Sequence, residues 1–376
     1  MLAFPALAIP LAGQLHLDVG RVLGISFWMY MLFGLSALPW GMAADRWGAR
    51  RLLLLYHSGA ALSSLAAAGC TRSPERLAAA LAALGFFSGV YHPAGLGWLS
   101  REIKRTSVGL AWNGIFGNLG MAAAPLLTGL AVWLSGVRAA FLLLAALNIF
   151  GAALVAACPR EGAPAAQQPD QGGGTCRTGA FCILLAAMML GGFAYRGSTV
   201  ILPAYFELQN RQIFQWLISH TSGGISPNLV ATASASIVYA AGMLGQYAGG
   251  RAAERRDLRI CYLAFHAAAV PVAWLMSVAA DVPLMLLAMA YFFFLLGIQP
   301  VENTLVARLT PAKLRHSAYG AKFILTFGIG AVAVKTVEAL EIRSGPGSIF
   351  VMLAGVSLLL TGVISTLIRA TRASWK

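Results

Sequence analysis

Charged residues are scarce in this chain. Only 11% of its 376 residues are Asp, Glu, Lys or Arg, whereas about a quarter of a soluble domain is charged. Apolar residues make up 59% of the sequence, and the mean hydropathy is +0.73. This composition excludes a soluble globular protein and indicates a chain that lies in a membrane.

Cysteine is also rare, and its spacing carries no motif. The cysteines are Cys70, Cys158, Cys176, Cys182 and Cys261. They form no CxxC pair, which excludes a disulfide framework and a zinc site. The sequence further lacks a nucleophile–base constellation, a metal-ligand cluster and a phosphate-binding glycine loop. We therefore predict a protein that is not an enzyme and uses no metal or cofactor.

The chain begins with an apolar run that has no basic segment ahead of it. A cleavable signal peptide needs such a segment, so none is expected. The net charge of +14 raises the possibility of nucleic-acid binding. However, the basic residues lie at the ends of apolar stretches, as in the cytoplasmic loops of membrane proteins. We therefore expect a lipid bilayer and no nucleic acid as the partner of this chain.

Apolar stretches of roughly 20 residues are candidates for transmembrane helices, and the sequence contains about twelve apolar stretches. After a first stretch at 1–15, they cover approximately 22–44, 52–70, 77–100, 107–134, 139–157, 179–206, 229–249, 260–280, 283–306, 317–340 and 349–368. The first is too short to cross the hydrocarbon unaided, and we expect the natural start to lie upstream. The sequence thus predicts an all-α polytopic protein of 12 transmembrane helices.

A Pro-, Gly- and Gln-rich segment at 158–178 interrupts this pattern. Such a composition cannot bury a core and is typical of a flexible linker. It predicts two pseudo-symmetric six-helix bundles, at 1–157 and 179–376. A second long loop, 207–228, carries Phe214, Trp216, Leu217 and Ile218, which we expect to lie along the membrane interface.

A charged loop at 41–51 joins the second and third apolar stretches. It reads Gly-Met-Ala-Ala-Asp-Arg-Trp-Gly-Ala-Arg-Arg. If this loop is cytoplasmic, basic residues on the cytoplasmic side outnumber those outside by roughly three to one, as the positive-inside rule requires. We therefore expect a multi-pass protein of the inner membrane, with its linker and C-terminus in the cytoplasm.

The two halves share an internal repeat. The segment from Gly41 to Arg46 recurs as Gly-Arg-Ala-Ala-Glu-Arg at 250–255, after the counterpart of the second helix. Gly109 and Gly117 are echoed about 210 residues later by Gly320 and Gly328. A looser echo relates Gly89 and Pro93 to Gly297 and Pro300.

The charged loop and its degenerate copy resemble the signature of the major facilitator superfamily, and the resemblance extends over essentially the whole chain. The family implies two six-helix bundles around a central cavity, which rock to give alternating access. The segment 91–95, Tyr-His-Pro-Ala-Gly, is also similar to the fosmidomycin-resistance branch of efflux proteins. Residues 120–129 resemble the superfamily's antiporter motif, with Gly120, Pro125 and Gly129 retained and with Ala124 and Thr128 in place of glycines.

The resemblance assigns a gating role to the charged loop. A carboxylate at Asp45 can pair with Arg or lie against the positive end of a helix, and such contacts form on the cytoplasmic side only when that side is closed. The arginines could instead serve only to anchor the topology. The predicted gating residues are Gly41, Asp45, Arg46, Gly48, Arg50, Arg51, Gly250, Glu254 and Arg255.

Ionisable residues inside a membrane are costly and by default mark a pathway or a paired structural site. Arg196, halfway along the seventh helix, is the strongest candidate for a substrate contact, since a guanidinium suits carboxylate or phosphonate groups. The alternative is a buried arginine whose donors are satisfied by backbone carbonyls. Polar groups expected in the cavity, or alternatively in helix–helix hydrogen bonds, are Tyr91, Asn113, Asn118 and Tyr195.

Four further residues are candidates for coupling. Glu302 lies at a depth similar to that of Lys322, and we predict that the two form a proton- or substrate-linked pair. Lys335 is a further cavity candidate, although it could also pair with Glu338 or reach the interface. His92 titrates near neutral pH and could relay protons, or be a structural residue. Apart from Glu302, no carboxylate lies clearly within the apolar stretches.

Taken together, the sequence predicts a monomeric secondary transporter of a small organic anion. Intramembrane basic residues outnumber carboxylates, which favours the anion, and the antiporter-like motif favours proton-coupled efflux. Uptake of an organic anion is the alternative direction. A transporter-like sensor or assembly protein that no longer transports is the alternative of another class.

Overall fold

The computed structural model describes residues 1–102, 106–158, 178–221, 223–310 and 322–372, and contains no strand within these ranges. The helices before the linker are η1 (Pro5–Leu7), α1 (Ala8–Leu15), α2 (Val19–Ile25), α3 (Phe27–Leu35), α4 (Ala37–Trp47), α5 (Ala49–Gly69), α6 (Pro74–Ser88), α7 (Tyr91–Glu102), α8 (Thr106–Ser135) and α9 (Val137–Ala157).

The helices after the linker are α10 (Thr178–Gln209), α11 (Arg211–His220), α12 (Pro227–Arg255), α13 (Leu258–Met276), α14 (Asp281–Leu309), η3 (Ile324–Gly328), η4 (Ile329–Ala331), α16 (Val332–Ser344) and α17 (Gly347–Ala370). Several begin at residues that suit a helix start. Ser226 accepts a hydrogen bond from the N–H of Leu229 at the start of α12, and Asp257 accepts one from the N–H of Arg259 at the start of α13.

Nine helices in the described ranges are long and apolar enough to cross a membrane, and a tenth span is counted if one bent pair is taken as a single helix. The segment Pro5–Leu15 is apolar but shorter, as the sequence predicts. An all-α polytopic membrane protein is therefore confirmed, whereas the count of 12 stays a prediction. Residues 159–177 of the expected linker lie outside the described residues, as do Gly320 and Cys176 of the sequence patterns.

Three of the expected helices are interrupted: the second, the fourth and the eleventh. The second is divided at Ser26 and Ser36, with Val19–Leu35 and Ala37–Trp47 bent by 45° relative to one another, and the fourth is divided at Gly89 and Val90. At Ser26 the side chain competes locally with the backbone, because its Oγ donates to Leu23 O, whereas Ser36 Oγ donates to Phe86 O on α6. The eleventh contains a π-helical turn, η3, followed by a 3₁₀ turn, η4. Such breaks are frequent at functional sites.

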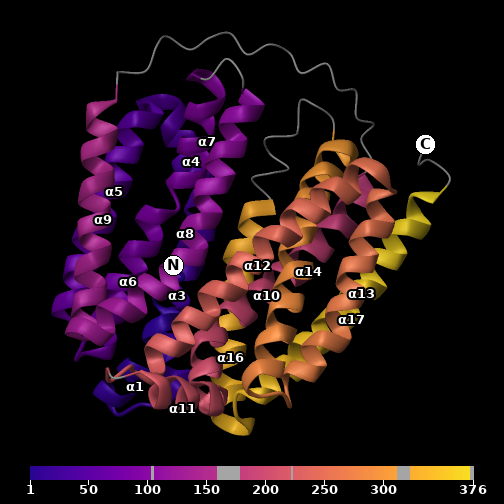
Figure 1. Ribbon diagram of the computed structural model, residues 1–376. Coiled ribbons are helices and arrows are strands. Elements are labelled where there is room, and N and C mark those ends of the chain that lie inside the picture. The colour runs from indigo at the N-terminus through magenta and orange to yellow at the C-terminus, as the bar shows by residue number, and fades with distance from the viewer. Residues whose placement is uncertain (103–105, 159–177, 222, 311–321, 373–376) are drawn as a thin grey trace.

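The helices before and after the linker form two neighbouring groups (Figure 1). Helices α4 to α9 lie on the left of the view, and α12 to α17 lie on the right. Within the groups, α5 packs against α6 and α9, α13 packs against α14 and α17, and α10 packs against α17. Between the groups, α8 packs against α12, and α2 packs against α16. Helices α1 and α11 lie at the bottom of the view, at the end opposite α4 and α7.

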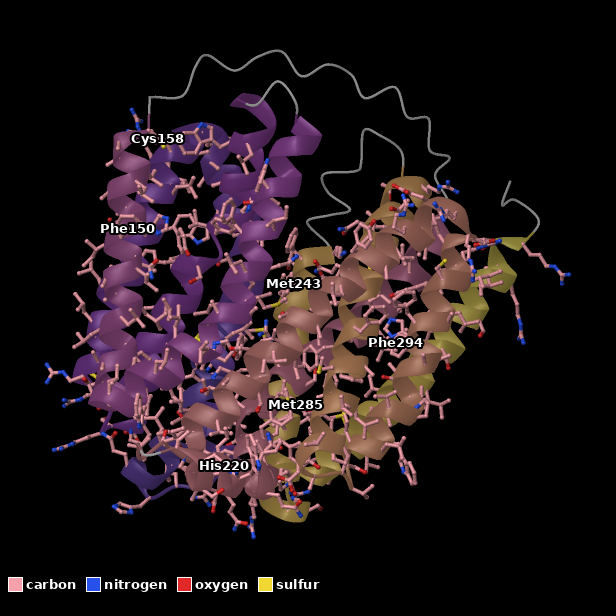
Figure 2. The ribbon with its side chains drawn as sticks, viewed as in Figure 1. Phe150, Cys158, His220, Met243, Met285 and Phe294 are labelled. Atoms are coloured by element: carbon pink, nitrogen blue, oxygen red, sulfur yellow. The ribbon has the colours of Figure 1, made fainter. Side chains whose placement is uncertain are left out.

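Large apolar side chains cover the outer surface. Phe150, on the outer face of α9, is 61% exposed and points away from the other helices (Figure 2). Leu134, Leu154, Leu358 and Leu359 are likewise exposed. Exposed apolar patches of this extent mark a surface that meets lipid or another protein, and here the membrane-length helices indicate lipid.

Candidate functional site

Arg196 is buried where the two groups of helices meet. It lies in α10 and is 3% exposed. Its guanidinium carbon is 3.8 Å from the ring centroid of Tyr30 in α3 and 6.0 Å from that of Tyr195. These contacts are cation–π interactions, and the first of them joins the two halves of the chain.

The tyrosines around Arg196 are held by hydrogen bonds of their own. The hydroxyl of Tyr30 donates to Met1 O at 3.0 Å, and that of Tyr239 in α12 donates to Thr199 O at 3.4 Å. The hydroxyl of Tyr195 contacts Met121 Sδ in α8 at 3.5 Å. The wall around the guanidinium therefore combines residues from both sides of the linker.

The guanidinium itself is not neutralised. Among the described residues, no carboxylate forms an ion pair with Arg196, and its buried Nε has no hydrogen-bond partner. An isolated buried charge is costly. An anion that brings acceptor oxygens to this fork would relieve that cost, so the geometry of the site suits a carboxylate or phosphonate.

A second charged cluster lies within the C-terminal group. Glu302 Oε2 is 3.3 Å from Lys322 Nζ, and both side chains are almost buried. The structure thus brings this predicted pair together, although its role stays a prediction. Glu302 Oε1 also accepts a hydrogen bond of 2.9 Å from the hydroxyl of Tyr262. Lys322 donates to Asn303 Oδ1 at 2.7 Å.

His266 extends this cluster along α13. Its ring lies 5.1 Å from that of Tyr262, and its buried Nε2 has no hydrogen-bond partner among the described residues. The chain of polar groups His266, Tyr262, Glu302 and Lys322 therefore crosses three helical segments.

The polar residues of α7 have different environments. The Tyr91 hydroxyl donates to Asn113 Oδ1 in α8 at 2.8 Å. The His92 ring packs in an aromatic cluster with Phe33, Phe323 and Phe327, at centroid distances of 5.9, 5.4 and 6.4 Å. His92 therefore touches the eleventh helix one residue from Lys322, although no hydrogen bond between the two is found in the described part of the chain.

Lys335 lies apart from both clusters. Its Nζ is 2.7 Å from Glu338 Oε2 on the same turn of α16, and half of the lysine side chain is exposed. The structure therefore gives Lys335 the helix-surface pair that the sequence analysis offered as its alternative role.

Among the described residues, the charged loop forms no hydrogen bond or ion pair with the other half. Gly48 has φ of +85°, a conformation that favours glycine, and this residue turns the chain between α4 and α5. Asp45 and Arg46 are exposed, and within the described ranges Asp45 has neither a hydrogen bond nor an ion pair. In the copy at the end of α12, Glu254 is 4.0 Å from Arg251 on the same helix, and Arg255 is exposed.

The two copies of the loop are nevertheless built alike. Gly41 packs beside Pro93, and Gly250 packs beside Pro300. Arg50 donates to the carbonyls of Ala156 and Cys158 at the end of α9, at 2.7 and 3.2 Å.

The residue equivalent to Arg50 is Arg259, at the same sequence spacing as Gly41 and Gly250. It donates to Thr371 Oγ1 after α17 at 2.7 Å, and to Asp257 at 2.6 Å. Each half therefore uses one arginine to tie the start of its third helix to the end of its last.

A seam between α8 and α12 joins the two halves. Gly129 packs so closely on Thr232 that an added Cβ would collide with the threonine hydroxyl. The N–H of Leu126, next to Pro125, donates to Ser236 Oγ at 3.0 Å. Gly120, by contrast, has nothing within 4 Å of the position of an added Cβ. Two of the three predicted packing residues therefore lie at this seam.

The same seam contains a chain of amides. Asn118 Nδ2 donates to Gln246 Oε1 at 2.5 Å, and Gln246 Nε2 donates to Gln299 Oε1 in α14 at 2.8 Å. Met243, one turn from Gln246, lies at the boundary between the purple and orange helices in Figure 2. Asn118 was a candidate from the sequence, and the structure assigns it a helix–helix hydrogen bond.

A second seam joins α2 and α3 to the eleventh helix. An added Cβ at Gly34 would collide with the backbone of Gly328. Between α2 and α16, the N–H of Gly20 donates to Glu341 Oε2 at 2.8 Å. The contacts between the halves therefore include the end of the molecule that carries α1 and α11.

Several residues of these sites have no counterpart in the sequence analysis. They are Tyr30, Tyr239, Gln246, Tyr262, His266 and Gln299. Each is a polar residue within an apolar span, which is a usable signal. Their partners lie on other helices, so the sequence alone does not show which of them face one another.

The comparisons with known proteins agree with this architecture. The family model described as Major Facilitator Superfamily matches residues 1–334. A bacterial homologue of the human lysosomal transporter Spinster, in an inward-facing and unoccupied conformation, has a TM-score of 0.78 and 13% identity over 100% of this chain and 95% of that one.

Two other solved structures are similar. The nucleoside transporter NupG has a TM-score of 0.71 and 15% identity, with 99% of this chain and 95% of that one covered. The peptide transporter POT in complex with sulfate has a TM-score of 0.75 and 14% identity, with coverages of 99% and 92%. No curated protein sequence matches the chain.

These neighbours show the fold, and the family model shows the family. The transporters among the neighbours also agree with the prediction that the chain is not an enzyme. This chain therefore belongs to the major facilitator superfamily, and it is a multi-pass membrane protein of the secondary-transporter type.

Proposed function

We propose that this protein exports a small organic anion by alternating access, in exchange for protons. The observation that carries the proposal is the buried Arg196, whose guanidinium lies at the meeting of the two halves without a carboxylate partner among the described residues. The tyrosine rings around it exclude water, and this strengthens its attraction for an anionic group. The substrate-bound state would place a carboxylate or phosphonate in the fork of the guanidinium.

The pair of Glu302 and Lys322 is the proposed coupling site. A proton that binds Glu302 would remove its attraction for Lys322 and free the lysine from its ion pair. The hydroxyl of Tyr262, at 2.9 Å, would keep the carboxyl oriented in either state. His92 is the second candidate for a proton relay, because it packs beside the segment that carries Lys322.

The proposed topology follows the basic residues. The loop at 41–51, the linker at 158–178 and the C-terminus would face the cytoplasm, with six-helix units at 1–157 and 179–376 in the inner membrane. The seams then hold the outer end closed, and the exposed Asp45 would belong to an open cytoplasmic gate. Export is preferred because of the antiporter-like segment at 120–129 and the similarity of residues 91–95 to the fosmidomycin-resistance branch.

A proteoliposome assay tests this proposal. Purified protein is reconstituted with a panel of organic carboxylates and phosphonates, and counterflow and pH-driven fluxes are measured with Arg196→Ala as the matched control. Accelerated efflux under an inward proton gradient, lost in the variant, is expected. Counterflow without any effect of the gradient would leave a uniporter and remove the exchange with protons. Accumulation of the anion inside the vesicles together with protons would indicate uptake. No flux with any anion would favour a sensor that does not transport.

A further inference from the structure

The eleventh helix contains a wide turn that is directly followed by a tight one. The π-helical turn η3 (Ile324–Gly328) leads into the 3₁₀ turn η4 (Ile329–Ala331), and regular α-helix resumes in α16 at Val332. A π turn holds more residues than an α-helical turn, and a 3₁₀ turn holds fewer. The second turn therefore offsets part of the excess of the first, and the residues between them are out of α-helical register with both flanks.

The residues that are out of register touch the other half of the chain. The ring centroid of Phe327 lies 5.6 Å from that of Phe33 in α3 and 6.4 Å from that of His92 in α7. Gly328 packs so closely on Gly34 in α3 that a Cβ added at Gly34 would collide with its backbone. The contact of α3 with the C-terminal half therefore depends on the shape of this turn.

The hydroxyl of Thr326, inside η3, lacks the hydrogen bond that an α-helix would give it. Its Oγ1 is buried and has no partner among the described residues. In a regular helix a threonine hydroxyl can donate to the carbonyl four residues earlier, as Thr304 does to Pro300 O at 2.9 Å. Regular α geometry would bring Lys322 O within reach of Thr326 in the same way. Because an unpaired buried hydroxyl is costly, Thr326 favours a regular helix over the π turn.

We propose that the segment 324–331 is a conformational switch between this pair of turns and a regular α-helix. In the α form, Phe327 and Gly328 turn about the helix axis by up to about 100°, which is the angle of one residue. Phe327 then leaves the ring of His92, and Gly328 leaves the backbone of Gly34. The change therefore releases the contact between the halves at this seam.

The two forms exchange contacts between the halves for a contact within one helix. The observed form has the aromatic cluster and the close packing on α3, whereas the α form has the bond from Thr326 to Lys322 O. An aromatic contact and a neutral hydrogen bond contribute similar free energies, so both forms are accessible. The switch requires that the halves move relative to one another. It requires neither the substrate nor the exchange with protons proposed above.

The test is fluorine NMR of the full-length protein in detergent, with 4-fluorophenylalanine incorporated in place of Phe327 alone. Ring currents from His92 shift the signal in the observed form, and this shift is lost in the α form. Gly34→Ala collides with Gly328 in the observed form, so it should raise the share of the α form. Gly355→Ala in α17 meets nothing within 4 Å and should leave that share unchanged. The same chemical shift and signal ratio in wild type and Gly34→Ala would overturn the proposal.

A second pair of variants separates the turn from a mere rotation of the ring. Thr326→Val removes the bond of the α form only, so the share of that form should fall about fivefold, which corresponds to about 1 kcal/mol. Thr304→Val is the matched control, because its hydroxyl bond is present in both forms and its loss should not change the ratio. Both are measured in the wild-type and Gly34→Ala backgrounds. A ratio that Thr326→Val leaves unchanged would show that the ring moves without the turn, and would overturn the switch. Neither comparison uses a substrate or a proton gradient, so failure of the export proposal would not affect this result.

Discussion

The carboxylate of Glu341, near the end of α16, accepts a hydrogen bond of 2.8 Å from the backbone N–H of Gly20 at the start of α2. The two residues are on opposite sides of the linker. The first N–H groups of a helix have no partner within that helix, so Glu341 supplies one from the other half. This bond would be lost whenever the halves separate at the end that carries α1 and α11.

Glu341→Gln should therefore favour the state in which this end is open. The amide still offers a neutral acceptor, and a hydrogen bond to a charged group contributes about 1.5–3 kcal/mol against about 0.5–1.5 kcal/mol for a neutral one. The ratio of closed to open molecules should therefore fall roughly fivefold, which corresponds to about 1 kcal/mol. Spin labels at Arg21 and Arg343, both exposed beside this seam, would report the change by electron–electron distance measurements. Glu75→Gln, an exposed carboxylate that bonds Ser73, is the control. Identical distance distributions for all three proteins would contradict this prediction.

Arg196→Lys should raise the KM for an anionic substrate by roughly tenfold to a hundredfold, because an ammonium cannot reproduce the planar fork of a guanidinium. Tyr30→Phe keeps a ring over the guanidinium and removes the hydroxyl with its hydrogen bond to Met1, so its KM should change much less than that of the lysine variant. Initial rates of counterflow in proteoliposomes measure both. A wild-type KM for the lysine variant would show that Arg196 does not bind the anion.

Neither single replacement of the Glu302–Lys322 pair should retain coupled transport. Glu302→Gln leaves the lysine without its ion-pair partner, and Lys322→Gln leaves the carboxylate without its own. Loss of one member of a buried pair costs about 3–5 kcal/mol. The exchange Glu302→Lys with Lys322→Glu keeps both charges and should recover part of the pH-driven flux and of the thermal stability. Recovery of stability without flux would make the pair purely structural.

Gly129→Ala should destabilise the seam between α8 and α12, because the new methyl group would meet Thr232. Overpacking of this kind costs about 1–3 kcal/mol. Gly120→Ala on the same helix meets nothing and should be neutral or stabilising by up to about 1 kcal/mol, through helix propensity. The midpoint temperatures of thermal unfolding in detergent compare the two variants. Adding Thr232→Ala to Gly129→Ala should restore its midpoint, because the colliding side chain is removed. Equal midpoints for both variants would disprove close packing at Gly129.

Asp257 provides a pH-dependent contact outside the membrane spans. Hydrogen bonds from the Arg259 side chain lower the pKa of Asp257 below its ordinary value of 3.8. The stabilisation by the charged carboxylate is therefore fully present above that value and is lost as the pH falls through the lowered pKa.

The midpoint temperatures of thermal unfolding of the wild-type protein and of Asp257→Asn should accordingly differ by a constant amount above about pH 5 and converge at lower pH. The neutral amide still caps α13, so the capping part of the loss in the free energy of unfolding should be at most about 1 kcal/mol. Loss of the charged contact with Arg259 adds to it. Thermal unfolding between about pH 3 and pH 6 measures this. A difference that stays the same throughout would rule out a charged Asp257 as its cause.

Much of the fold could be predicted from the sequence, because a membrane span is a local property. For example, the expected span 139–157 and the observed helix α9 (Val137–Ala157) differ only at the start. The repeat could be predicted as well, since Gly41 and Gly250 occupy equivalent positions beside Pro93 and Pro300. Both signals are contained in short segments of chain.

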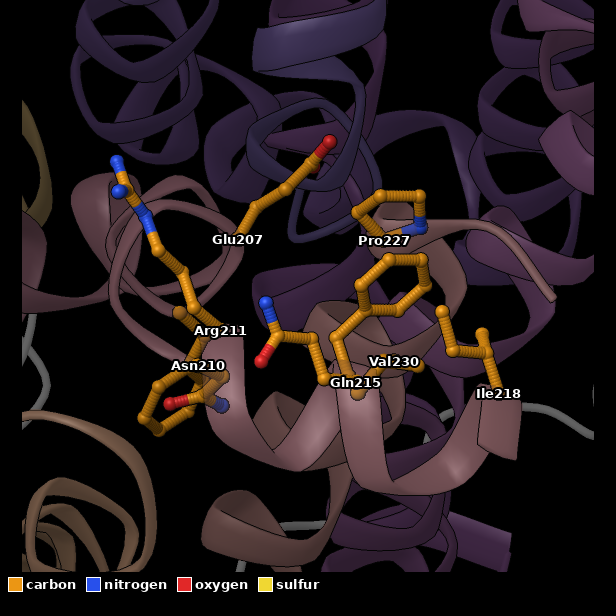
Figure 3. A pocket seen from close by; sticks show the side chains of 9 residues that line it. Glu207, Asn210, Arg211, Gln215, Ile218, Pro227 and Val230 are labelled. Atoms are coloured by element: carbon orange, nitrogen blue, oxygen red, sulfur yellow. The ribbon is translucent and has the colours of Figure 1, made fainter. Parts of the chain in front are cut away.

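The remaining features depend on contacts between distant helices. Tyr262 donates to Glu302 across 40 residues of sequence, and Asn118 donates to Gln246 across 128. No local period encodes such pairs. The loop at 207–228 was expected to lie at the interface but not to be helical, although Ile213, Phe214, Leu217 and Ile218 have helical spacing. Helix α11 (Arg211–His220) formed by this stretch creates the wall of the cavity in Figure 3.

Arg50 and Arg259 have a mechanical consequence. Each joins the first turn of one helix to the last turn of another in its own half, so the two helix ends are held together on the side of the molecule that carries the charged loop. A displacement of the last helix of either half would therefore be transmitted directly to the segment that precedes the third helix. Relative motion of the halves would then be concentrated at the seams, where Gly34 and Gly129 allow helices from the two halves to pack closely.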